Sequence, residues 1–521
     1  METKKLALIG CGIAAVPILE AAQKMSVETH CFALAINPQT EGLFNFHHRV
    51  DYLDIETLLT KCTEIGVHGI IATSENTTAS VAELTTRMGL PGNRFDGNFT
   101  AGNKYLQRQA ATNAQYFKQP QFGYYGEVEL SLPLMVKTTE SSGKKGVRFA
   151  ENEQDYKAAL GELTTEFPNG KILIEQVLMG GVEYSIECLS YRGEHQIVQV
   201  TQKDSSGPPY FVELGHHQPG KMDPEARKNL DLAIPEILDL TGVQNSLSHV
   251  EVKVINGEIY FIELGARAGG DRIADTLLGL SNDCDYFRSA VEIALGEFTF
   301  HACTTHSYSG IYFLCAQTAY LKPLFDFAKG KEWCRELSVP THDLQIKYGN
   351  DDSGTSGYLI YQSDHKITLR DVPFEASRIN GHKDVLALLI EFNQKIKREI
   401  SHDELVSGMQ RFIDDGNVVA IVYDNVILAM MNVYCRFKET KEAYINNVEV
   451  APDYQGFGLS KLLMEKSFEV IKEHDFESAV LHVEKANRAA VELYLKYQFH
   501  FTGEEKISGD VVLHEMRKSL N

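Results

Sequence analysis

The sequence predicts a multidomain protein that combines α/β and α+β folds, and three observations support this prediction. At about 150 residues per domain, 521 residues correspond to three or four folding units. Apolar strands alternate with helices over the first hundred residues, whereas strands joined by hairpins and glycine-rich loops follow from about residue 120. A second change of pattern near residue 366 predicts a further domain that runs to the C-terminus.

Residues 1–100 are predicted to form a parallel sheet covered by helices on both faces. We expect strands and helices at 6–9, 14–24, 30–36, 54–65, 68–72 and from 77 to a terminating glycine at 89. Gly10, Gly12 and Ala15 have the spacing of a dinucleotide-binding fingerprint. However, the second strand ends at Asn37 and Pro38, without the acidic residue that would bind a ribose. Tight packing of strand against helix is the preferred interpretation, and nucleotide binding is the alternative.

Composition and charge restrict the class of protein. Hydrophobic residues make up 43% and charged residues 23%, which excludes a disordered, collagenous or coiled-coil chain. The net charge of −21, without a basic patch, argues against nucleic acid and anionic membranes as partners. The nine cysteines form no C-x-x-C pair, which argues against a disulfide framework or a structural zinc site. No apolar run approaches the roughly 20 residues of a membrane span. Glycines and a proline interrupt the apolar segment 6–19, so we expect a cytoplasmic protein.

The middle of the chain carries residues suited to binding a polyphosphate and a divalent cation. Lys137 ends an apolar strand, and the loop 141–147 has two glycines and two lysines, whose N–H groups and charges suit phosphates. Glu251 and Glu263 lie on the two strands of a hairpin with an Asn-Gly turn, so their carboxylates are expected to face one space and hold Mg²⁺. Arg267 follows shortly after and suits a phosphate or carboxylate.

These residues resemble the motifs of the ATP-grasp carboxylate–amine ligases in order and in spacing. The matching segments are Gly89–Gly92, Asn103–Tyr105, Val136–Val147, Ile174–Ser185, His249–Glu251 and Ile262–Asp271. The resemblance covers about residues 1–365. It implies a Rossmann-like pre-ATP-grasp domain at 1–100 and a two-lobed ATP-grasp domain at 101–365, with a lid lobe at about 120–190. The nucleotide site is then expected in the second of these domains.

The resemblance also implies a role for each matching residue. The residues implied to bind ATP are Lys104, Lys137, Ser142, Gly143, Lys144, Gly146, Glu175, Gln176, Val177 and Glu183. Glu251 and Glu263 are implied to bind Mg²⁺ or Mn²⁺, and Arg267 to stabilise an acyl phosphate as a catalytic residue. Gly265 is a departure, because many members have asparagine there, so one metal ligand is either missing or replaced by water. This pattern is similar to the branch of amino-acid and dipeptide ligases.

In that branch a Glu-x-Gly-His segment lines the substrate site, and Glu213–His216 looks similar. The residues implied to bind substrate are Glu213, His216, His217, Arg267, Gly269 and Gly270. For His216, a histidine satisfied locally within a turn is an equal alternative. The implied reaction begins when a carboxylate attacks the γ-phosphate of ATP, and an amine then attacks the acyl phosphate to form an amide.

The C-terminal segment carries a second site. A strand at 443–450 precedes the loop Gln455–Ser460 and a helix, whose first N–H groups suit a pyrophosphate. We expect this site to rely more on backbone N–H groups than the ligase site does. With the segment 478–499, this pattern resembles the GNAT family of N-acetyltransferases over about residues 366–519 and implies a GNAT fold for the domain 366–521. The residues implied to bind acetyl-CoA are Val450, Gln455, Gly456, Gly458, Leu459, Ser460 and Asn487, of which Ser460 is a mild departure. Tyr494 is implied to protonate the departing thiolate. Glu449 is either the catalytic base or a plain strand residue.

Together, the two resemblances predict a bifunctional enzyme that uses ATP, Mg²⁺ or Mn²⁺, and acetyl-CoA. One domain joins an amino-acid carboxylate to an amine, and the other N-acetylates the substrate or the product. Two alternatives stay open: the acetyltransferase serves resistance or detoxification, or one domain senses ATP or acetyl-CoA without turnover. The expected partners are small molecules, an amino acid and an amine. Ligases of this type are often dimers, so a homodimer is one option.

Overall fold

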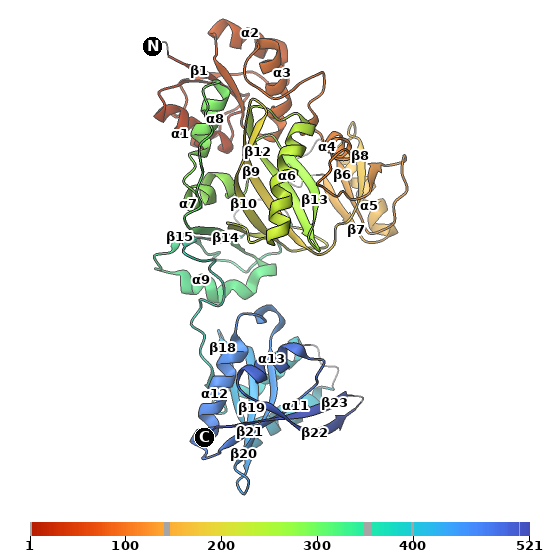
Figure 1. Ribbon diagram of the computed structural model, residues 1–521, viewed down its shortest axis with the longest axis vertical. Helices are drawn as coiled ribbons and strands as arrows, with labels where there is room; N and C mark the ends of the chain where they lie inside the picture. Colours follow the sequence, from red (N-terminus) through yellow and green to blue (C-terminus); the bar gives the residue numbers. More distant parts are fainter. Residues whose placement is uncertain (1–2, 140–145, 349–355, 397–400, 510, 521) are drawn as a thin grey trace. The chain divides into compact units, whose positions relative to one another are not determined.

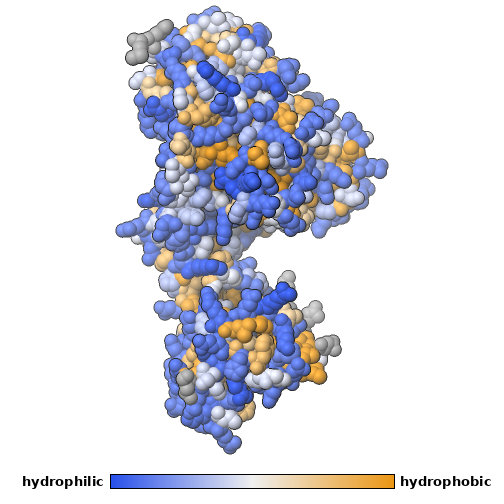
Figure 2. Space-filling view, in the orientation of Figure 1, coloured by the Kyte–Doolittle hydropathy of each residue, from blue (hydrophilic) through white to orange (hydrophobic). Residues whose placement is uncertain are grey.

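A computed structural model describes residues 3–139, 146–348, 356–396, 401–509 and 511–520. The chain folds into two compact units (Figure 1). The first comprises residues 1–319 and 328–366, and the second comprises residues 320–327 and 367–521. Polar side chains dominate the face shown in Figure 2, as a net charge of −21 leads us to expect. None of the described helices is long and apolar enough to cross a membrane.

The N-terminal sheet is parallel, in the order β3-β2-β1-β4. Its elements are β1 (Lys5–Ile9), α1 (Val16–Lys24), β2 (Glu28–Phe32), β3 (Phe46–His48), α2 (Ile55–Ile65), β4 (Gly69–Ala72) and α3 (Thr78–Met88). The predicted parallel sheet is confirmed, and Gly89 ends α3 in the left-handed conformation as predicted. The prediction that the second strand reaches residue 36 was wrong. The backbone N–H of Asn37 bonds to the Cys11 carbonyl and its side chain caps the short 3₁₀ helix Pro38–Thr40, so the chain turns back and adds β3.

The first unit contains two antiparallel sheets in addition. A four-stranded sheet, in the order β5-β8-β6-β7, consists of β5 (Phe122–Tyr124), β6 (Leu134–Thr138), β7 (Val147–Ala150) and β8 (Ile172–Gln176). An eight-stranded sheet, in the order β13-β12-β9-β10-β11-β14-β16-β15, consists of β9 (Val182–Tyr191), β10 (Glu194–Ser205), β11 (Glu213–Gln218), β12 (Ser246–Ile255), β13 (Glu258–Gly265), β14 (Tyr308–Leu314), β15 (Cys334–Ser338) and β16 (Gly357–Ser363). Asn256 and Gly257 have positive φ and join β12 to β13, which confirms the predicted hairpin.

Helices pack against the two antiparallel sheets. They are α4 (Lys104–Ala111), α5 (Glu153–Glu166), α6 (Pro224–Thr241), α7 (Leu278–Ser281) and α8 (Tyr286–Ala294), with a π-helix at Ile273–Leu277. Helix α5 packs against the small sheet, and α8 links the large sheet to the N-terminal sheet. Ile234 and Ile237 of α6 form a fully buried core with Phe261 of β13. Helix α8 lies beside α1 (Figure 1), and its Val291 shares a core with Leu19. The N-terminal sheet is thereby fixed to the rest of the unit.

The second unit is built on one seven-stranded sheet, in the order β17-β18-β19-β20-β21-β23-β22. Its strands are β17 (Ser377–Arg378), β18 (Asn417–Tyr423), β19 (Val426–Phe437), β20 (Glu442–Val450), β21 (Ser478–Val483), β22 (His500–Ser508) and β23 (Val511–Ser519). Its helices are α9 (Lys322–Ala328), of which residues 322–327 belong to this unit, α10 (Val385–Lys395), α11 (His402–Asp415), α12 (Leu459–Glu473) and α13 (Arg488–Lys496). Only β20 and β21 pair in parallel among its described strands.

Candidate active sites

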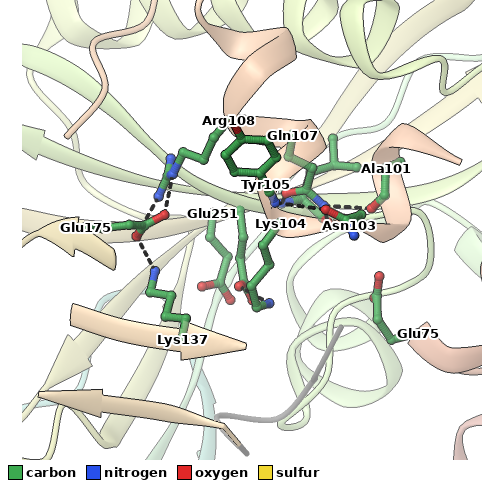
Figure 3. Close-up of polar contacts among 12 residues, drawn as sticks. Glu75, Ala101, Asn103, Lys104, Tyr105, Gln107, Arg108, Lys137, Glu175 and Glu251 are labelled. Atoms are coloured by element: carbon green, nitrogen blue, oxygen red, sulfur yellow. Dashed lines mark hydrogen bonds and ion pairs between the residues drawn. The ribbon is translucent and has the colours of Figure 1, made fainter. Parts of the chain in front are cut away.

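The first candidate site is an assembly of charged side chains from α4, the small sheet and the hairpin of β12 and β13 (Figure 3). Lys104 is the first residue of α4, and Asn103 caps this helix through its side-chain oxygen. The Lys104 Nζ lies 2.7 Å from Glu263 Oε2. Glu263 is directly opposite Glu251 in the hairpin register, so the two side chains project from the same face of the sheet.

Glu175 is a buried acid that binds two cations (Figure 3). Its Oε1 accepts a hydrogen bond of 2.7 Å from Arg108 Nε, and its Oε2 lies 2.6 Å from Lys137 Nζ. Burial alone would raise the pKa of Glu175, but the charges of Arg108 and Lys137 outweigh burial and lower it to about 2. Because the carboxylate is bound to these cations, a contact between residue 175 and adenine would have to use the backbone.

Lys203 is the centre of a second buried cluster. Its Nζ lies 2.7 Å from Glu251, 3.1 Å from Glu213 and 3.4 Å from Glu183. The four side chains come from four neighbouring strands, β12, β9, β10 and β11. One lysine therefore balances three acids and fixes their positions on one face of the large sheet.

The pKa values of Glu251 and Glu263 shift in opposite directions. Burial and the neighbouring acids raise the pKa of Glu251 to about 7, although Lys203 opposes this shift. Burial also acts on Glu263, but the charge of Lys104 outweighs it and lowers the pKa of Glu263. The two side chains are 19% and 35% exposed. Two adjacent, partly exposed carboxylates fit a hard divalent cation such as Mg²⁺, whose charge would also favour the ionised form of Glu251.

Arg267 is held by an acid from the N-terminal sheet. Its Nε lies 3.0 Å from Oε2 of Glu75, which follows the carboxyl end of β4. At Gly265, where many ATP-grasp ligases have asparagine, a Cβ would come within 2.3 Å of His249 Cε1 and 2.8 Å of Glu75 Oε2. His249 and Glu75 therefore occupy the space that a side chain at position 265 would need, and Glu75 brings a carboxylate there instead.

Gly269, two residues after Arg267, packs against a fully buried acid, Glu187. The Gly269 N–H donates to Glu187 Oε2 at 3.0 Å, and a Cβ on Gly269 would come within 2.3 Å of Glu187 Oε1. The Gly270 carbonyl accepts a hydrogen bond from the N–H of Ile273, where the π-helix begins. Burial raises the pKa of Glu187 to about 7. Glu187 thus fixes the backbone that follows Arg267.

The two predicted histidines have different surroundings. His217 is buried with both ring nitrogens engaged, by Asp204 at 2.9 Å and by the Tyr361 hydroxyl at 3.0 Å. His216 is fully buried, and neither of its ring nitrogens has a hydrogen-bond partner among the described residues. It pairs with Lys203 across β10 and β11, so it projects from the face that carries the acids, and burial lowers its pKa to about 3. A neutral imidazole with open nitrogens therefore belongs to this site, whereas the His217 ring is used in packing.

The remaining residues predicted to bind ATP are less informative. Ser142, Gly143 and Lys144 lie outside the described residues. Gly146 is buried, has a φ of 71°, and its carbonyl accepts a hydrogen bond from the Thr138 N–H before β7 begins. Gln176 at the end of β8 is exposed, and Val177 after it is buried.

The second candidate site lies where two parallel strands separate. β20 and β21 pair from Glu442 with Ser478 to Tyr444 with Val480, and their register ends there. Beyond Tyr444, β20 stays paired with β19 as far as Val450. Beyond Tyr444, the edge of β20 that faces away from β19 is no longer paired with β21. An extended ligand could form backbone hydrogen bonds with this edge, as an added strand would.

The loop after β20 leads into the start of helix α12. The Gln455 side chain donates to the Val450 carbonyl at 3.2 Å, and Gly456 and Gly458 have φ of 81° and 91°. Because α12 begins at Leu459, the first N–H groups of the helix have no partner within it. The Leu459 side chain is buried, so only its backbone faces a ligand, and Ser460 is half-buried.

A cationic side chain from a distant segment contacts this loop. Arg370 donates to the Gly456 carbonyl through Nε at 3.1 Å and Nη2 at 2.7 Å. The charges of Lys496 and, more weakly, Arg370 lower the pKa of Lys461 in the first turn of α12. Arg370 therefore adds a charged contact from a distant segment to a site that is expected to rely more on backbone N–H groups.

Three further predicted residues flank the opening. Tyr494 of α13 is 6% exposed and packs against Phe499, and burial raises its pKa to about 12, which keeps its hydroxyl protonated. Glu449 is half-buried on β20, opposite Met430 of β19. The Asn487 Oδ1 accepts from the Ala490 N–H and caps α13, which leaves the Asn487 amide N–H groups for a ligand.

Sequence reasoning missed five charged residues of these sites. They are Glu75, Arg108, Glu187, Lys203 and Arg370. Arg108 was predictable, because it follows Lys104 by one helical turn and so lies on the same face of the helix. Glu75 was also predictable, because it follows a parallel strand and ligands bind at the carboxyl edge of such strands. Lys203 was not predictable from the sequence, because its partners depend on how four strands pair.

The fold and the sites define two catalytic domains. In the first unit, two antiparallel sheets carry the lysines and acids of the site, which is the architecture of an ATP-grasp domain. In the second unit, two parallel strands separate and a glycine-containing loop leads into a helix, which is the architecture of an acetyltransferase. Residues 130–275 match the ATP-grasp domain family, and residues 384–499 match the acetyltransferase (GNAT) family. The chain thus has an ATP-grasp ligase domain followed by a C-terminal GNAT acetyltransferase domain, and it is an enzyme. The two folds imply binding of ATP with Mg²⁺ and of acetyl-CoA.

Individual relatives support the ligase architecture. Over 243 residues the chain is 25% identical to dapdiamide A synthase of Enterobacter agglomerans, a match that covers 43% of this chain and 56% of that protein, about half its length. The L-amino acid ligase of Bacillus licheniformis is 19% identical with a TM-score of 0.56, over 70% of this chain and 94% of the other. Phosphoribosylglycinamide synthetase of Anaerococcus prevotii is 15% identical with a TM-score of 0.53, over 70% and 95%. The structural likenesses show the fold, and a homodimer stays a prediction.

Proposed function

We propose that the chain is a bifunctional enzyme. Its ATP-grasp domain joins the carboxylate of an amino acid to an amine and converts ATP to ADP and phosphate. Its GNAT domain transfers the acetyl group of acetyl-CoA to an amine of the substrate or of the product. The observation that carries the ligase proposal is that Lys104 and Lys203 contact the paired carboxylates of Glu263 and Glu251. Lys137, which pairs with Glu175, adds a third lysine to the same site.

The proposed ligation needs charge balance at each step. Lys104 and Lys137 bind phosphate oxygens of ATP while a substrate carboxylate oxygen attacks the γ-phosphorus and ADP leaves. Arg267, held by Glu75, neutralises the acyl phosphate. The amine nitrogen then attacks the acyl carbon, phosphate leaves, and the nitrogen loses a proton as the amide forms. Mg²⁺ held by Glu251 and Glu263 would supply further positive charge at the phosphates.

Two observations support an amino acid as substrate. Dapdiamide A synthase and the L-amino acid ligase are among the similar proteins. His216 offers a neutral, buried imidazole on the face that carries Glu213 and Lys203, and we propose that it lines the space for the substrate. Glu213 places a carboxylate nearby that suits the ammonium group of an amino acid.

In the acetyl transfer, the opened edge of β20 receives the acetyl-CoA arm. The start of α12, with Arg370 and Lys461, binds the pyrophosphate. Glu449 accepts a proton from the acceptor amine, whose nitrogen attacks the acetyl carbon. Tyr494 donates its proton to the thiolate of CoA as the thioester breaks, and its raised pKa keeps that proton in place until then.

The function is tested by ADP release and product mass across pairs of amino acids, with ATP, Mg²⁺ and acetyl-CoA present. The wild-type protein is expected to form an amide and to acetylate an amine. Glu263→Gln should abolish ADP release and spare acetyl transfer, whereas Tyr494→Phe should slow acetyl transfer and spare ligation. The matched controls are Glu258→Gln, exposed on the same strand, and Tyr497→Phe, on the same helix end.

Three outcomes would contradict the proposal. Binding of ATP without ADP release across a broad panel would favour a sensor. Loss of both activities in either variant would argue against separate sites. Acetylation of compounds unrelated to the ligation product, at higher kcat/KM than the product itself, would favour the detoxification alternative.

A further inference from the structure

We propose that Cys284, His301 and Cys303 bind a zinc ion on the first unit, at a site separate from both candidate active sites. One ligand atom from each residue lies within 4.8 Å of the other two. Cys284 is buried, Cys303 is half-buried and His301 is exposed. This thiol–histidine cluster touches Gln196, which lies seven residues before Lys203 on β10, a separation of about 23 Å along the strand.

Backbone pairing holds the two cysteines opposite each other. Asn282 and Thr305 form an antiparallel bridge, and the Asp283 N–H donates to the Thr304 carbonyl at 3.1 Å. The Asp283 carboxylate in turn accepts from the Thr304 N–H at 2.6 Å. In this register residue 284 is opposite residue 303, and residue 301 lies on the same side as 303, two positions away. The fold therefore positions all three ligands before any ion binds.

Neighbouring groups support metal binding at two of the ligands. The His301 Nδ1 lies 3.4 Å from the Thr299 carbonyl, which only accepts, so a hydrogen bond there places the proton on Nδ1 and leaves the Nε2 lone pair for a metal. The Gln196 amide donates to the His301 carbonyl at 2.7 Å and to Cys303 Sγ at 3.7 Å. A carbonyl behind a histidine ligand and an N–H directed at a sulfur are the outer contacts typical of thiolate and imidazole metal sites.

The donor set selects the kind of ion. Two sulfurs and one imidazole favour Zn²⁺ over Mg²⁺, which takes oxygen ligands. In a tetrahedral zinc site the ligand atoms are about 3.6–3.8 Å apart, so the three ligand atoms have to move together by at most about 1 Å. Three protein ligands leave a fourth position, and the exposure of His301 gives water access to it. The argument from sequence against a zinc site relied on the missing C-x-x-C pair, whereas here strand pairing brings the ligands together.

The position of the cluster indicates what the ion would do. Cys284 precedes helix α8 and Cys303 follows it, so an ion bound by both closes the segment that contains α8. Val291 and Ala294 of α8 are buried against α1 of the N-terminal sheet. We therefore expect Zn²⁺ to stabilise the attachment of the N-terminal sheet to the first unit.

The test uses full-length protein, reduced and stripped of metal with a chelator, and titrated with Co²⁺ and then with Zn²⁺. Co²⁺ bound by two thiolates gives a sulfur-to-cobalt charge-transfer band, which a carboxylate site at Glu251 and Glu263 cannot give. We expect this band to saturate at one equivalent of Co²⁺ and to disappear when Zn²⁺ is added. Zn²⁺ should also raise the unfolding temperature of the first unit.

Variants distinguish the cluster from other thiols. Cys303→Ser should abolish the band, and Gln196→Leu should weaken Zn²⁺ binding about tenfold while leaving the ligands in place. Cys334→Ser, at a half-buried cysteine on β15, is the matched control and should change neither. Circular dichroism of each stripped variant shows whether it is folded, so loss of the band in a folded Cys303→Ser protein counts as loss of a ligand.

Two results would overturn the proposal. One is the absence of a sulfur-to-cobalt band in reduced wild-type protein, or a band that persists in Cys303→Ser. The other is a wild-type protein that binds no Zn²⁺ under reducing conditions and carries Cys284 and Cys303 as a disulfide when purified, seen as a mass lower by two hydrogens.

Discussion

Single residues in the first site are fixed by pairing of buried charges. Glu175 binds Arg108 and Lys137, and Lys203 binds three acids, so each cluster depends on every member. Buried pairs contribute little net stability when intact, but removal of one partner leaves an uncompensated charge. The first site is therefore expected to be sensitive to neutral substitutions that hardly change the volume of a side chain.

Glu175→Gln tests this at one residue. At pH 7 we expect the variant to lose about 3–5 kcal/mol of the free energy of unfolding of the first unit, because two cations lose their partner. The pKa of Glu175 is lowered in the folded protein to about 2, so its contribution is present above its ordinary pKa and is lost as pH falls toward 2. The difference between wild type and variant, measured by urea unfolding, should therefore shrink below about pH 4.5.

The matched control is Glu258→Gln, because its side chain is 58% exposed and 3.8 Å from Lys118. It should change the free energy of unfolding by less than about 0.5 kcal/mol. A Glu175→Gln variant as stable as this control at pH 7 would contradict the assignment of Glu175 to a structural ion pair.

Elements were predictable where local chemistry sets them. The Asn-Gly turn predicts the hairpin of β12 and β13, and Gly89 predicts the end of α3. The short strand β3 was not predictable, because it follows a turn built on a hydrogen bond from Asn37 to Cys11, a contact between distant segments. For the same reason the sequence predicts Glu251, Glu263 and the loop before α12, which local motifs mark. It does not predict Lys203 and Arg370, which reach their sites through contacts between distant segments.

The loop Gln455–Ser460 and helix α12 give a prediction at the scale of an element. Arg370→Ala should weaken acetyl-CoA binding about threefold to tenfold, because an exposed cation and a tie to the Gly456 carbonyl are both lost. Because the charges are exposed, the loss should be smaller at high salt. Isothermal titration of acetyl-CoA at two ionic strengths measures both effects.

Two variants give this prediction its controls. Arg370→Lys keeps the charge but not the forked contact, so it should recover only part of the affinity. Lys383→Ala removes an exposed cation elsewhere in the unit and should leave binding unchanged. Equal affinity of wild type and Arg370→Ala for acetyl-CoA at low salt would contradict a role for Arg370 at the loop.

At the scale of the whole molecule, the chain is divided into two compact units whose sequences interleave. Residues 320–327 belong to the second unit, although they lie between segments of the first. The Tyr423 hydroxyl bonds to Asp326, and the ring of Tyr454 meets that of Tyr320. The change of pattern near residue 366 gave no sign of this arrangement, because eight residues carry too little periodicity to show which core they join.

Ligand-dependent calorimetry of the full chain tests this division. We expect two unfolding transitions, because each unit has its own core. At 100 times its dissociation constant a ligand adds about 2.7 kcal/mol to the free energy of unfolding of the unit that binds it. Mg²⁺-ATP should therefore raise the temperature of one transition by about 5 °C, and acetyl-CoA should raise the other.

Tyr423→Phe tests the assignment of residues 320–327 to the second unit. It should lower only the transition that acetyl-CoA raises, because it removes the hydrogen bond that holds residues 320–327 to that unit. Tyr358→Phe, whose hydroxyl bonds to exposed Glu336 in the first unit, is the control and should leave that transition unchanged. A single transition raised by both ligands would contradict the division into two independent units. A lower ATP-dependent transition in Tyr423→Phe would show that residues 320–327 belong to the first unit.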